Sequence, residues 1–425
     1  MKKYILLIIT AIIFLSCSDM LDIYPHSAIS PGAVKDKDLP ALANGMYNKV
    51  QNMPRESFIL NDLLGGLVMG KLNANANDLI NTITKIDDAT IRSTWNGYFL
   101  ALSQVNNVLS ITSNMEMTPE AKKVKGAGHF FRAYIYVNLV THWGNVPILE
   151  ESTMDNIPRD QTENVWQFIE RDIEKSIELL QPFTEVGNYY FVSQDAALAL
   201  KARVALYRGK KAEAALIAED LITKGQFKLD DFEKIFRKAP NTEIIFAFEN
   251  LTEESSVKMS ELFYNYSHPN KGSRIYRPTM EIATLFDDTD NRKLISWDTF
   301  GGEDCFNKYP SGQTGTDPVI LFRAAELFLI SAEAQGLAGI NRLNELRNKR
   351  GLANITPAPA TDDEYLDLIL EERSKEFLIE GHRYYDMIRT GKANKIGLQD
   401  YQTLLPVPES QVLVNPLLGQ NEGYY

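Results

Sequence analysis

The sequence predicts a mainly α-helical protein built from pairs of packed helices with few short strands, and three observations predict this class. Apolar residues recur with the helical period over long segments, of which 91–111 is typical. Alanines on both sides of Gly209, within 196–224, predict two closely packed helices joined by a tight turn. Only 243–249 has the clear composition of a strand. Such pairs are typical of degenerate tetratricopeptide-like repeats, although their irregular lengths leave a generic helical bundle open.

The expected elements follow from periodicity and from turn residues. Helix pairs are predicted over 39–111, 121–180, 196–224 and 319–350, and shorter or single helices over 277–286 and 366–391. Segment 61–81 is rich in Gly and Asn and is predicted to be a loop. Trp95 recurs with the apolar face of its helix, so we expect it in the core. Frequent prolines in 404–425 predict an extended C-terminal segment along the surface.

Size and charge limit the function classes. The chain has 425 residues, which is long enough for one large domain or two lobes. Its net charge is -12 at pH 7. This acidic balance argues against a nucleic-acid or anionic-membrane surface, since both favour a basic face. With Cys17 and Cys305 as the only cysteines, processing at Cys17 leaves no disulfide within the mature chain.

The N-terminus predicts a targeting segment. Lys2 and Lys3 precede an apolar run over 4–15, which is too short to span a bilayer. The run ends at Cys17 in a pattern that resembles a bacterial lipobox, so we expect a lipoprotein signal peptide over 1–16 and acylation of Cys17. An ordinary cleaved signal peptide is the alternative. Residues 17–32 contain Pro25 and Pro31 and read as the lipidated tether.

The helix predicted over 366–391 is unusually charged. Glu372, Glu376 and Glu380 follow at four-residue steps, so on one helix they share a face. A catalytic interpretation makes them a general acid and base. The favoured interpretation is a set of partly buried ion pairs that fixes how this helix packs. Arg323, Glu326 and Glu333 are expected to be near-neighbours on another helix, also with a structural role.

Several segments together resemble the SusD/RagB family of nutrient-uptake lipoproteins. The clearest is ER-x-x-E-x-x-x-EG-x-R-x-x-D-x-x-R-x-G, over 372–391. Further matches are the opening CSDMLDIYP at 17–25, the RAYIYVNLVTHWGNVP segment at 132–147, FRAAELFLISAEA at 322–334, LNELRNKRGL at 343–352, and the closing LLPVPESQVLVNPLLGQNEGY at 404–424. They occur in family order and span essentially the whole mature chain.

The resemblance implies a mainly helical fold with four tetratricopeptide-like units in a single domain over 33–425. The N-terminal part of this domain ends at about residue 225, and its C-terminal part covers about 270–425. It implies a lipid-anchored protein on the outside of the outer membrane. It also implies a lid on a SusC-like TonB-dependent transporter, to which oligosaccharides, or sometimes peptides, are delivered. The implied protein binds nutrients, is not an enzyme and needs no cofactor.

Glycans present C–H faces and hydroxyls, so a site for them needs exposed aromatic faces with Asn, Asp or Arg nearby. Segments 61–78 and 264–309 supply both outside the helical repeats. If the two segments converge on one face, together they would form such a site. The candidate ligand-binding residues are Trp297, which is the strongest, Tyr266, Tyr264, Tyr276, Arg274, Asp62, Asn75 and Asn77.

Three alternatives remain open from the residues. A glycoside hydrolase would need two acids facing a cleft about 5–9 Å apart. A purely structural partner of the transporter would have no exposed aromatics in a cleft. A calcium ion beside Asp287, Asp288 and Asp290 is conceivable, although the cluster lacks the glycine and distal glutamate of a calcium loop.

Overall fold

The computed structural model describes residues 34–251 and 257–425. Its α-helices are α2 (Leu39–Gln51), α3 (Glu56–Leu63), α4 (Asn77–Ile80), α5 (Ala89–Ser113), α6 (Pro119–Trp143), α7 (Thr162–Leu179), α8 (Phe183–Val186), α9 (Gln194–Tyr207), α10 (Lys211–Thr223), α11 (Phe232–Phe236), α12 (Ile282–Leu285), α13 (Lys293–Ser296), α14 (Ala324–Ala334), α15 (Ile340–Lys349), α16 (Asp362–Glu376), α17 (Arg383–Arg389) and α18 (Glu409–Val414). Its strands are β1 (Val68–Gly70), β2 (Ile244–Phe248), β3 (Tyr276–Pro278), β4 (Trp297–Phe300), β5 (Glu303–Phe306) and β6 (Val319–Arg323).

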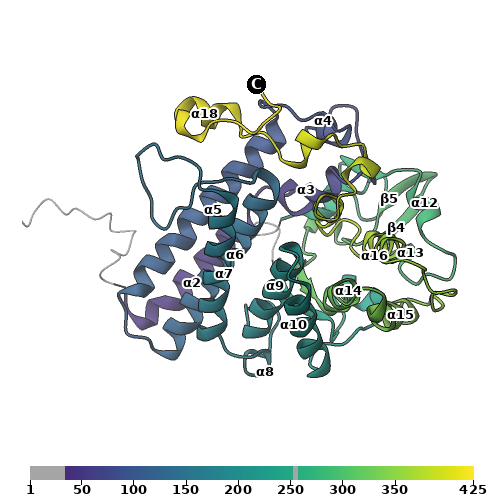
Figure 1. Ribbon diagram of the computed structural model, residues 1–425, viewed down its shortest axis with the longest axis horizontal. Coiled ribbons are helices and arrows are strands. Elements are labelled where there is room, and N and C mark those ends of the chain that lie inside the picture. The colour runs from purple at the N-terminus through teal and green to yellow at the C-terminus, as the bar shows by residue number, and fades with distance from the viewer. Residues whose placement is uncertain (1–33, 252–256) are drawn as a thin grey trace, which may run out of the picture.

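The long helices form an array of pairs, as predicted. Helices α2 and α5, α6 and α7, α9 and α10, and α14 and α15 pack as neighbours, and each pair also packs on the next. Figure 1 shows them side by side across the molecule, in chain order from purple to green. The mainly helical, tetratricopeptide-like fold class is therefore confirmed.

Local signals place the ends of these helices close to the expected residues. The Asp88 side chain accepts the Thr90 and Ile91 N–H groups at the start of α5, and Thr118 accepts the Ala121 N–H at the start of α6. Gly144 ends α6 with φ of 68°, a left-handed conformation that glycine adopts readily. Trp95 is buried, as expected.

A two-stranded antiparallel ladder of β2 and β6 lies in the core beside the array. Every residue of both strands is buried. The Phe246 ring packs against the rings of Tyr47, Phe130 and Phe131, which come from α2 and α6. These contacts join the C-terminal half of the chain to the first helices of the array.

Segment 319–335 corrects the sequence prediction. It is a strand followed by a helix, because Val319–Arg323 pairs with β2 before α14 begins. Arg323 therefore does not lie on one helix with Glu326 and Glu333, and the three do not pair with one another. Glu326 binds Arg203 and Glu333 binds Arg389, so their expected structural role holds with other partners.

Segment 366–391 also differs from the single helix predicted for it. Helix α16 ends at Glu376 and α17 begins at Arg383. At the break, Gly381 has φ of 80°, and a Cβ there would lie 2.4 Å from the Phe58 carbonyl oxygen. The side chains of Asn61 and Asp62 bind the Gly381 carbonyl and N–H. Contacts with α3 thus replace the helical hydrogen bonds, which periodicity alone does not reveal.

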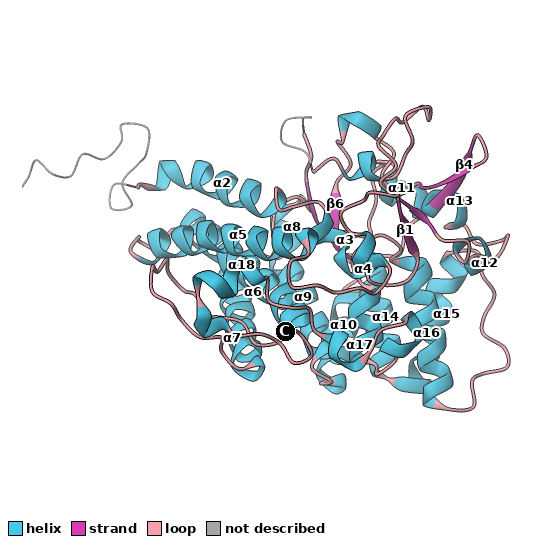
Figure 2. Ribbon diagram, turned by 90° about the horizontal axis from the view of Figure 1, so that it is seen from above, coloured by secondary structure: helices cyan, strands magenta, loops and turns pink. Residues whose placement is uncertain are grey.

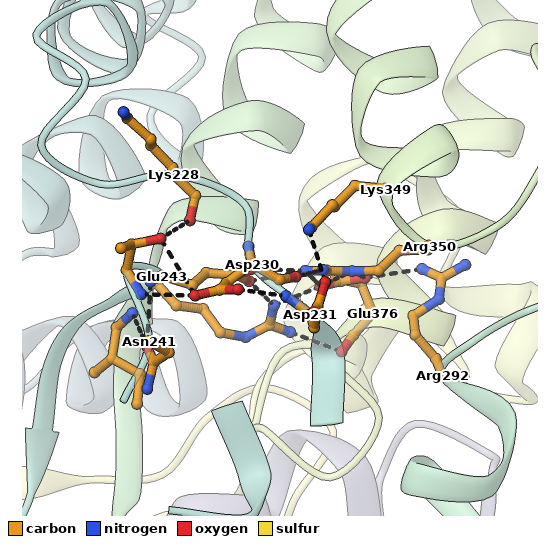
Figure 3. Close-up of polar contacts among 12 residues, drawn as sticks. Lys228, Asp230, Asp231, Asn241, Glu243, Arg292, Lys349, Arg350 and Glu376 are labelled. Atoms are coloured by element: carbon orange, nitrogen blue, oxygen red, sulfur yellow. Dashed lines mark hydrogen bonds and ion pairs between the residues drawn. The ribbon is translucent and has the colours of Figure 1, made fainter. Parts of the chain in front are cut away.

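The three glutamates nevertheless meet in one buried network, which we call the charged core. Its members are Glu243, Asp290, Arg292, Lys308, Arg323, Arg350, Glu372, Glu376 and Glu380. Glu376 contacts Arg292 at 2.9 Å and Arg350 at 2.8 Å, and also contacts Arg323. Figure 3 shows Glu376 between Arg292 and Arg350, with Glu243 on the far side of Arg350. The network ties β2, β6, α15, α16 and the segment 290–308 together.

Electrostatics keep the Glu376 carboxylate ionised. Burial opposes ionisation of Glu376, but Arg350, Arg323 and Arg292 outweigh it and hold the pKa of that carboxyl well below its usual range. Glu376 is completely buried and Glu372 is almost so. A general acid must carry a proton and reach its substrate, and Glu376 does neither. The ion-pair interpretation of these glutamates is therefore the one the geometry supports.

The C-terminal segment runs over the helices but is less extended than predicted, since it contains α18. The Trp143 indole N–H donates to the Pro406 carbonyl at 2.9 Å, and Arg159 donates to the Leu418 carbonyl at 2.6 Å. Figure 1 shows this yellow segment across the top of the helices. Over the described ranges 34–251 and 257–425, helices long and apolar enough to cross a bilayer are absent.

Replacing Glu376 by Gln tests the charged core. We expect the variant to lose about 3–5 kcal/mol of unfolding free energy, because three buried arginines lose a shared negative partner. Urea denaturation measures the loss. Glu364→Gln on the same helix is the control, since Glu364 is exposed and Gln can still accept the hydrogen bond from the Ala360 N–H, so we expect a change within about 0.5 kcal/mol. Equal stability of the two variants would contradict a structural role for Glu376.

Candidate ligand-binding site

Pairing of β1 with β3 brings the two segments of the predicted ligand site together. The strands are antiparallel, with Val68 opposite Pro278 and Gly70 opposite Tyr276. Lys71 continues the ladder by one residue, since its N–H donates to the Ile275 carbonyl at 2.8 Å. In an antiparallel pair, the residues after one strand and before the other emerge at the same end. Segments 61–78 and 264–309 therefore meet at this ladder.

The loop before β3 folds back on itself. The Arg274 N–H donates to the Tyr264 carbonyl at 2.9 Å, and the Gly272 N–H donates to the Asn265 carbonyl at 3.2 Å. These bonds close the base of the loop and leave residues 266–271 at its tip. The tip therefore projects from the same end of the ladder as residues 71–77.

A third segment, the hairpin of β4 and β5, contacts the loop before β3. Its tip places the Phe300 ring 4.7 Å from the His268 ring. Glu303 accepts a hydrogen bond from Asn265 and pairs with Arg274 at 2.8 Å. We call the exposed side chains of 71–77, 264–274 and 300–303 the loop face. Figure 2 shows β1 and β4 toward one side of the molecule, with β4 near its edge.

The chemistry of the loop face suits a polar ligand with flat apolar surfaces. Tyr266 is 73% exposed at the loop tip, so its ring is open to stacking. The Lys271 ammonium lies 5.7 Å from the centre of that ring. Asn73 and Asn75 are exposed on the neighbouring loop and offer both hydrogen-bond donors and acceptors.

Three predicted ligand residues are buried instead. Tyr264 and Tyr276 have no exposed surface, and Asp62 is almost fully buried beneath Gly381. The Tyr264 hydroxyl binds Asn307 at 2.6 Å. These side chains support the loops from below and leave no surface for a ligand, so we correct their assignment to a supporting role. The reason is the alternation of the short strands, which turns Tyr276 inward.

Trp297, the strongest candidate from sequence, lies at the base of the β4–β5 hairpin. It is partly buried and packs against the main core, and its indole nitrogen is enclosed. Tyr266 therefore takes its place as the most accessible aromatic of the predicted set. Arg274 is held by Glu303, and the Asn77 side chain donates to the Lys71 carbonyl at 2.5 Å, which shapes the loop. Asn75 is exposed.

Sequence reasoning missed other members of the loop face. Leu72 is 90% exposed, and Lys71, Lys271 and Phe300 also face solvent. Leu and Phe read from sequence as core residues. Only the folded loops reveal that Leu72 and Phe300 are exposed. Lys71 and Lys271 lie next to glycines in the sequence, and this pattern could have indicated exposed loop positions.

Two members of the acidic cluster considered for calcium bind cationic side chains instead. Both oxygens of Asp290 bind Arg292, at 2.9 and 2.7 Å, and Asp288 pairs with Lys293. Over residues 34–251 and 257–425, groups of three or more His, Cys, Asp or Glu side chains arranged for a metal ion are absent.

A separate groove of about 650 Å³ lies on another side of the molecule. Its walls come from α5, the loop 147–157 and the C-terminal segment with α18. Phe99, Leu100, Met154 and Val414 make it largely apolar. Its chemistry differs from that of the loop face, which combines one open aromatic ring with amides and cations.

Comparison with known proteins gives consistent matches. Residues 19–206 match a family model described as "Starch-binding associating with outer membrane", and residues 305–402 match one described as "SusD family". A "SusD-like protein P38" of Formosa agariphila is 25% identical over 508 aligned residues, which cover 100% of both chains.

Solved structures share the fold. A surface glycan-binding protein A from Bacteroides fluxus has a TM-score of 0.79 and 22% identity, covering 92% of this chain and 100% of that one. A laminarin binding SusD-like protein has a TM-score of 0.78 and 20% identity, covering 91% and 99%. At these identities the likeness establishes the architecture alone.

The Asp62 carboxyl accepts a hydrogen bond from the Gly381 N–H beneath the loops, and the pH dependence of stability tests this contact. Burial raises the pKa of Asp62 to about 7, against the lowering effect of its bond from the Gly381 N–H. A raised folded-state pKa stabilises the protein at low pH, and that stability is lost as pH rises through about 7. From pH 4 to 8, the unfolding free energy of wild type should therefore fall by roughly 2–4 kcal/mol relative to Asp62→Asn. Parallel pH profiles from chemical denaturation would contradict this.

Proposed function

This chain belongs to the SusD/RagB family of Bacteroidetes, and we propose that it is a cell-surface protein that captures glycans on its loop face. The observation that carries the proposal is the convergence of three irregular segments around Tyr266. Its ring is open to solvent, Lys271 lies beside it, and Asn73 and Asn75 are exposed on the loop that leaves the same end of the β1–β3 ladder. Aromatic stacking on the C–H face of a sugar and amide contacts to its hydroxyls are what such a surface offers.

The names of related proteins support the same class of ligand. One fold neighbour is named as a surface glycan-binding protein and another as laminarin binding. Binding of peptides or other small nutrients by the same surface is the alternative, because stacking and amide contacts also suit peptides. A ligand screen that pairs oligosaccharides with peptides of similar size decides between them.

A glycoside hydrolase is the rival from another class, and the charged core disfavours it. The glutamates that sequence offered as paired acids are enclosed and bound to arginines. On the loop face, Glu303 is engaged by Arg274 and Asn265. A hydrolase would need a protonated and a free carboxylate facing one cleft. Release of new reducing ends from a bound glycan would favour the hydrolase.

Delivery and anchoring complete the proposal. We propose that residues 1–16 are a signal peptide, that 17–32 form a tether acylated at Cys17, and that the protein faces outward on the outer membrane. It then acts as a lid on a SusC-like TonB-dependent transporter and passes glycans to it. The support is the N-terminal pattern and the family description, which associates its members with the outer membrane.

Tyr266→Ala tests the loop face. With an oligosaccharide found to bind wild type in a screen that includes laminarin and starch fragments, we expect the variant to bind about 1–3 kcal/mol more weakly by calorimetry. Tyr266→Phe should keep most of the affinity, since it keeps the ring. Leu216→Ala removes an exposed apolar side chain on α10 and is the control. Unchanged binding by Tyr266→Ala would place the ligand elsewhere.

Cys17→Ala tests the anchor. Because Cys17 is the proposed acylation site, the variant should leave the outer-membrane fraction or accumulate unprocessed. Fractionation and metabolic labelling with a fatty acid measure this. A variant that is still labelled and still sediments with the outer membrane would contradict the proposal. Cys17 lies outside the described residues, so this prediction rests on sequence.

A further inference from the structure

The outer side of the β1–β3 ladder carries positive charge. Val68, Tyr276 and Pro278 turn inward and are buried. Side chains alternate along a strand, so Met69 and Lys71 point to the other side, and Arg277 shares that side because it lies opposite Met69. Lys71 lies opposite Ile275 by its backbone bond, which makes Arg277 its diagonal neighbour across the ladder. Two cations thus lie close together at the foot of the loop face.

These cations make no ion pair among the residues that the structure describes. Lys71, Arg277 and Lys271 have no carboxylate within 4.0 Å there, and two acids of the neighbouring segments pair with other cations. Glu303 pairs with Arg274 at 2.8 Å, and Asp78 pairs with Lys85 at 2.7 Å. The chain as a whole is negatively charged, with a net charge of -12, whereas this small face carries a group of unpaired positive charges.

The third cation lies beside the proposed stacking ring. The Lys271 ammonium is 5.7 Å from the centre of the Tyr266 ring, and no carboxylate neutralises it within the described residues. A sugar stacked on Tyr266 would therefore place a ring substituent within reach of Lys271. Like charges on neighbouring strands repel, so an anion bound between Lys71 and Arg277 would also relieve a cost in the free protein.

From these positions we propose that the loop face, together with Arg277 on the adjoining side of the β1–β3 ladder, binds an acidic glycan whose carboxylate or sulfate groups meet Lys71, Arg277 and Lys271. The proposal rests on the proposed function, since it assigns the ligand class of that same face. Carboxylates and sulfates share the chemistry that recognises them, which is charge-assisted hydrogen bonding to ammonium and guanidinium groups. Tyr266 contributes stacking that every sugar ring shares, so the cations would set the preference for acidic over neutral glycans.

Calorimetry with matched oligosaccharides tests this. The probes are an oligogalacturonate for the carboxylate, a sulfated galactan fragment for the sulfate ester, and laminarin and neutral galactan fragments of equal length. We expect at least one acidic probe to bind about tenfold more tightly than the neutral ones, and raised salt to reduce the difference. The better acidic probe distinguishes carboxylate from sulfate.

The double variant Lys71→Gln, Arg277→Gln locates the effect. It should lose about tenfold in affinity for the acidic probe and keep its affinity for any neutral glycan. Lys122→Gln with Lys211→Gln is the control, because it removes the same charge from exposed positions on α6 and α10. Thermal melting confirms that each variant is folded.

The outcomes separate this inference from the proposed function. Neutral glycans that bind as tightly as acidic ones would overturn the acidic preference and leave glycan capture standing. Acid preference that survives the Lys71 and Arg277 changes would also overturn the inference. A hexaglutamate peptide that binds as tightly as the acidic sugars would overturn it too, because charge alone would then be recognised. Absence of binding to every glycan tested would overturn the proposed function itself.

Discussion

Ion pairing without access to water is the constraint on which the C-terminal half of this fold depends. The charged core draws its members from β6, α16, the segment 290–308 and the ends next to β2, α15 and α16, which are far apart in sequence. A buried charge is costly unless it is paired and hydrogen-bonded. Arg323 satisfies this need by bonding to Glu243, Glu376 and Glu380 together. Because each cation serves several carboxylates, displacement of one element would leave charges unpaired in several others.

The charged core also explains why the long charged segment must break. A continuous helix would keep Glu380 in line with Glu376. Helix α16 instead ends at Glu376, before Glu380, and Glu380 meets both Lys308 and Arg323. The Asn61 amide donates to the Gly381 carbonyl and the Asp62 carboxyl accepts from the Gly381 N–H, and these two bonds hold this bend against α3. The segment after α3 leads directly to β1. The contacts of Asn61 and Asp62 with Gly381 therefore fix the bend and also position one side of the loop face.

The loop face stands on this rigid support but contributes little to it. Tyr264 and Tyr276 are buried beneath it and hold the loops in place, while Tyr266, Leu72 and Lys271 project outward. Binding residues on loops held by a rigid scaffold can vary without loss of the fold. This arrangement fits a family whose members share one architecture at low sequence identity. Ligand class would then be set by a few exposed side chains, such as the cations beside the β1–β3 ladder.

The sequence by itself determined the helical class, the helix pairs, the strand at 243–249 and the segments that would hold the loop face. These follow from periodicity, glycines and prolines, which act over a few neighbouring residues. It also indicated that the glutamates of 372–380 are structural. Only the tertiary structure decided which side chains of those segments point outward. Tyr264, Tyr266 and Tyr276 have the same chemistry in sequence, but strand alternation and packing bury two and expose one. The break at Gly381 and the strand at Val319–Arg323 were likewise decided by partners far along the chain, α3 and β2, whose contacts outweigh local helical preference.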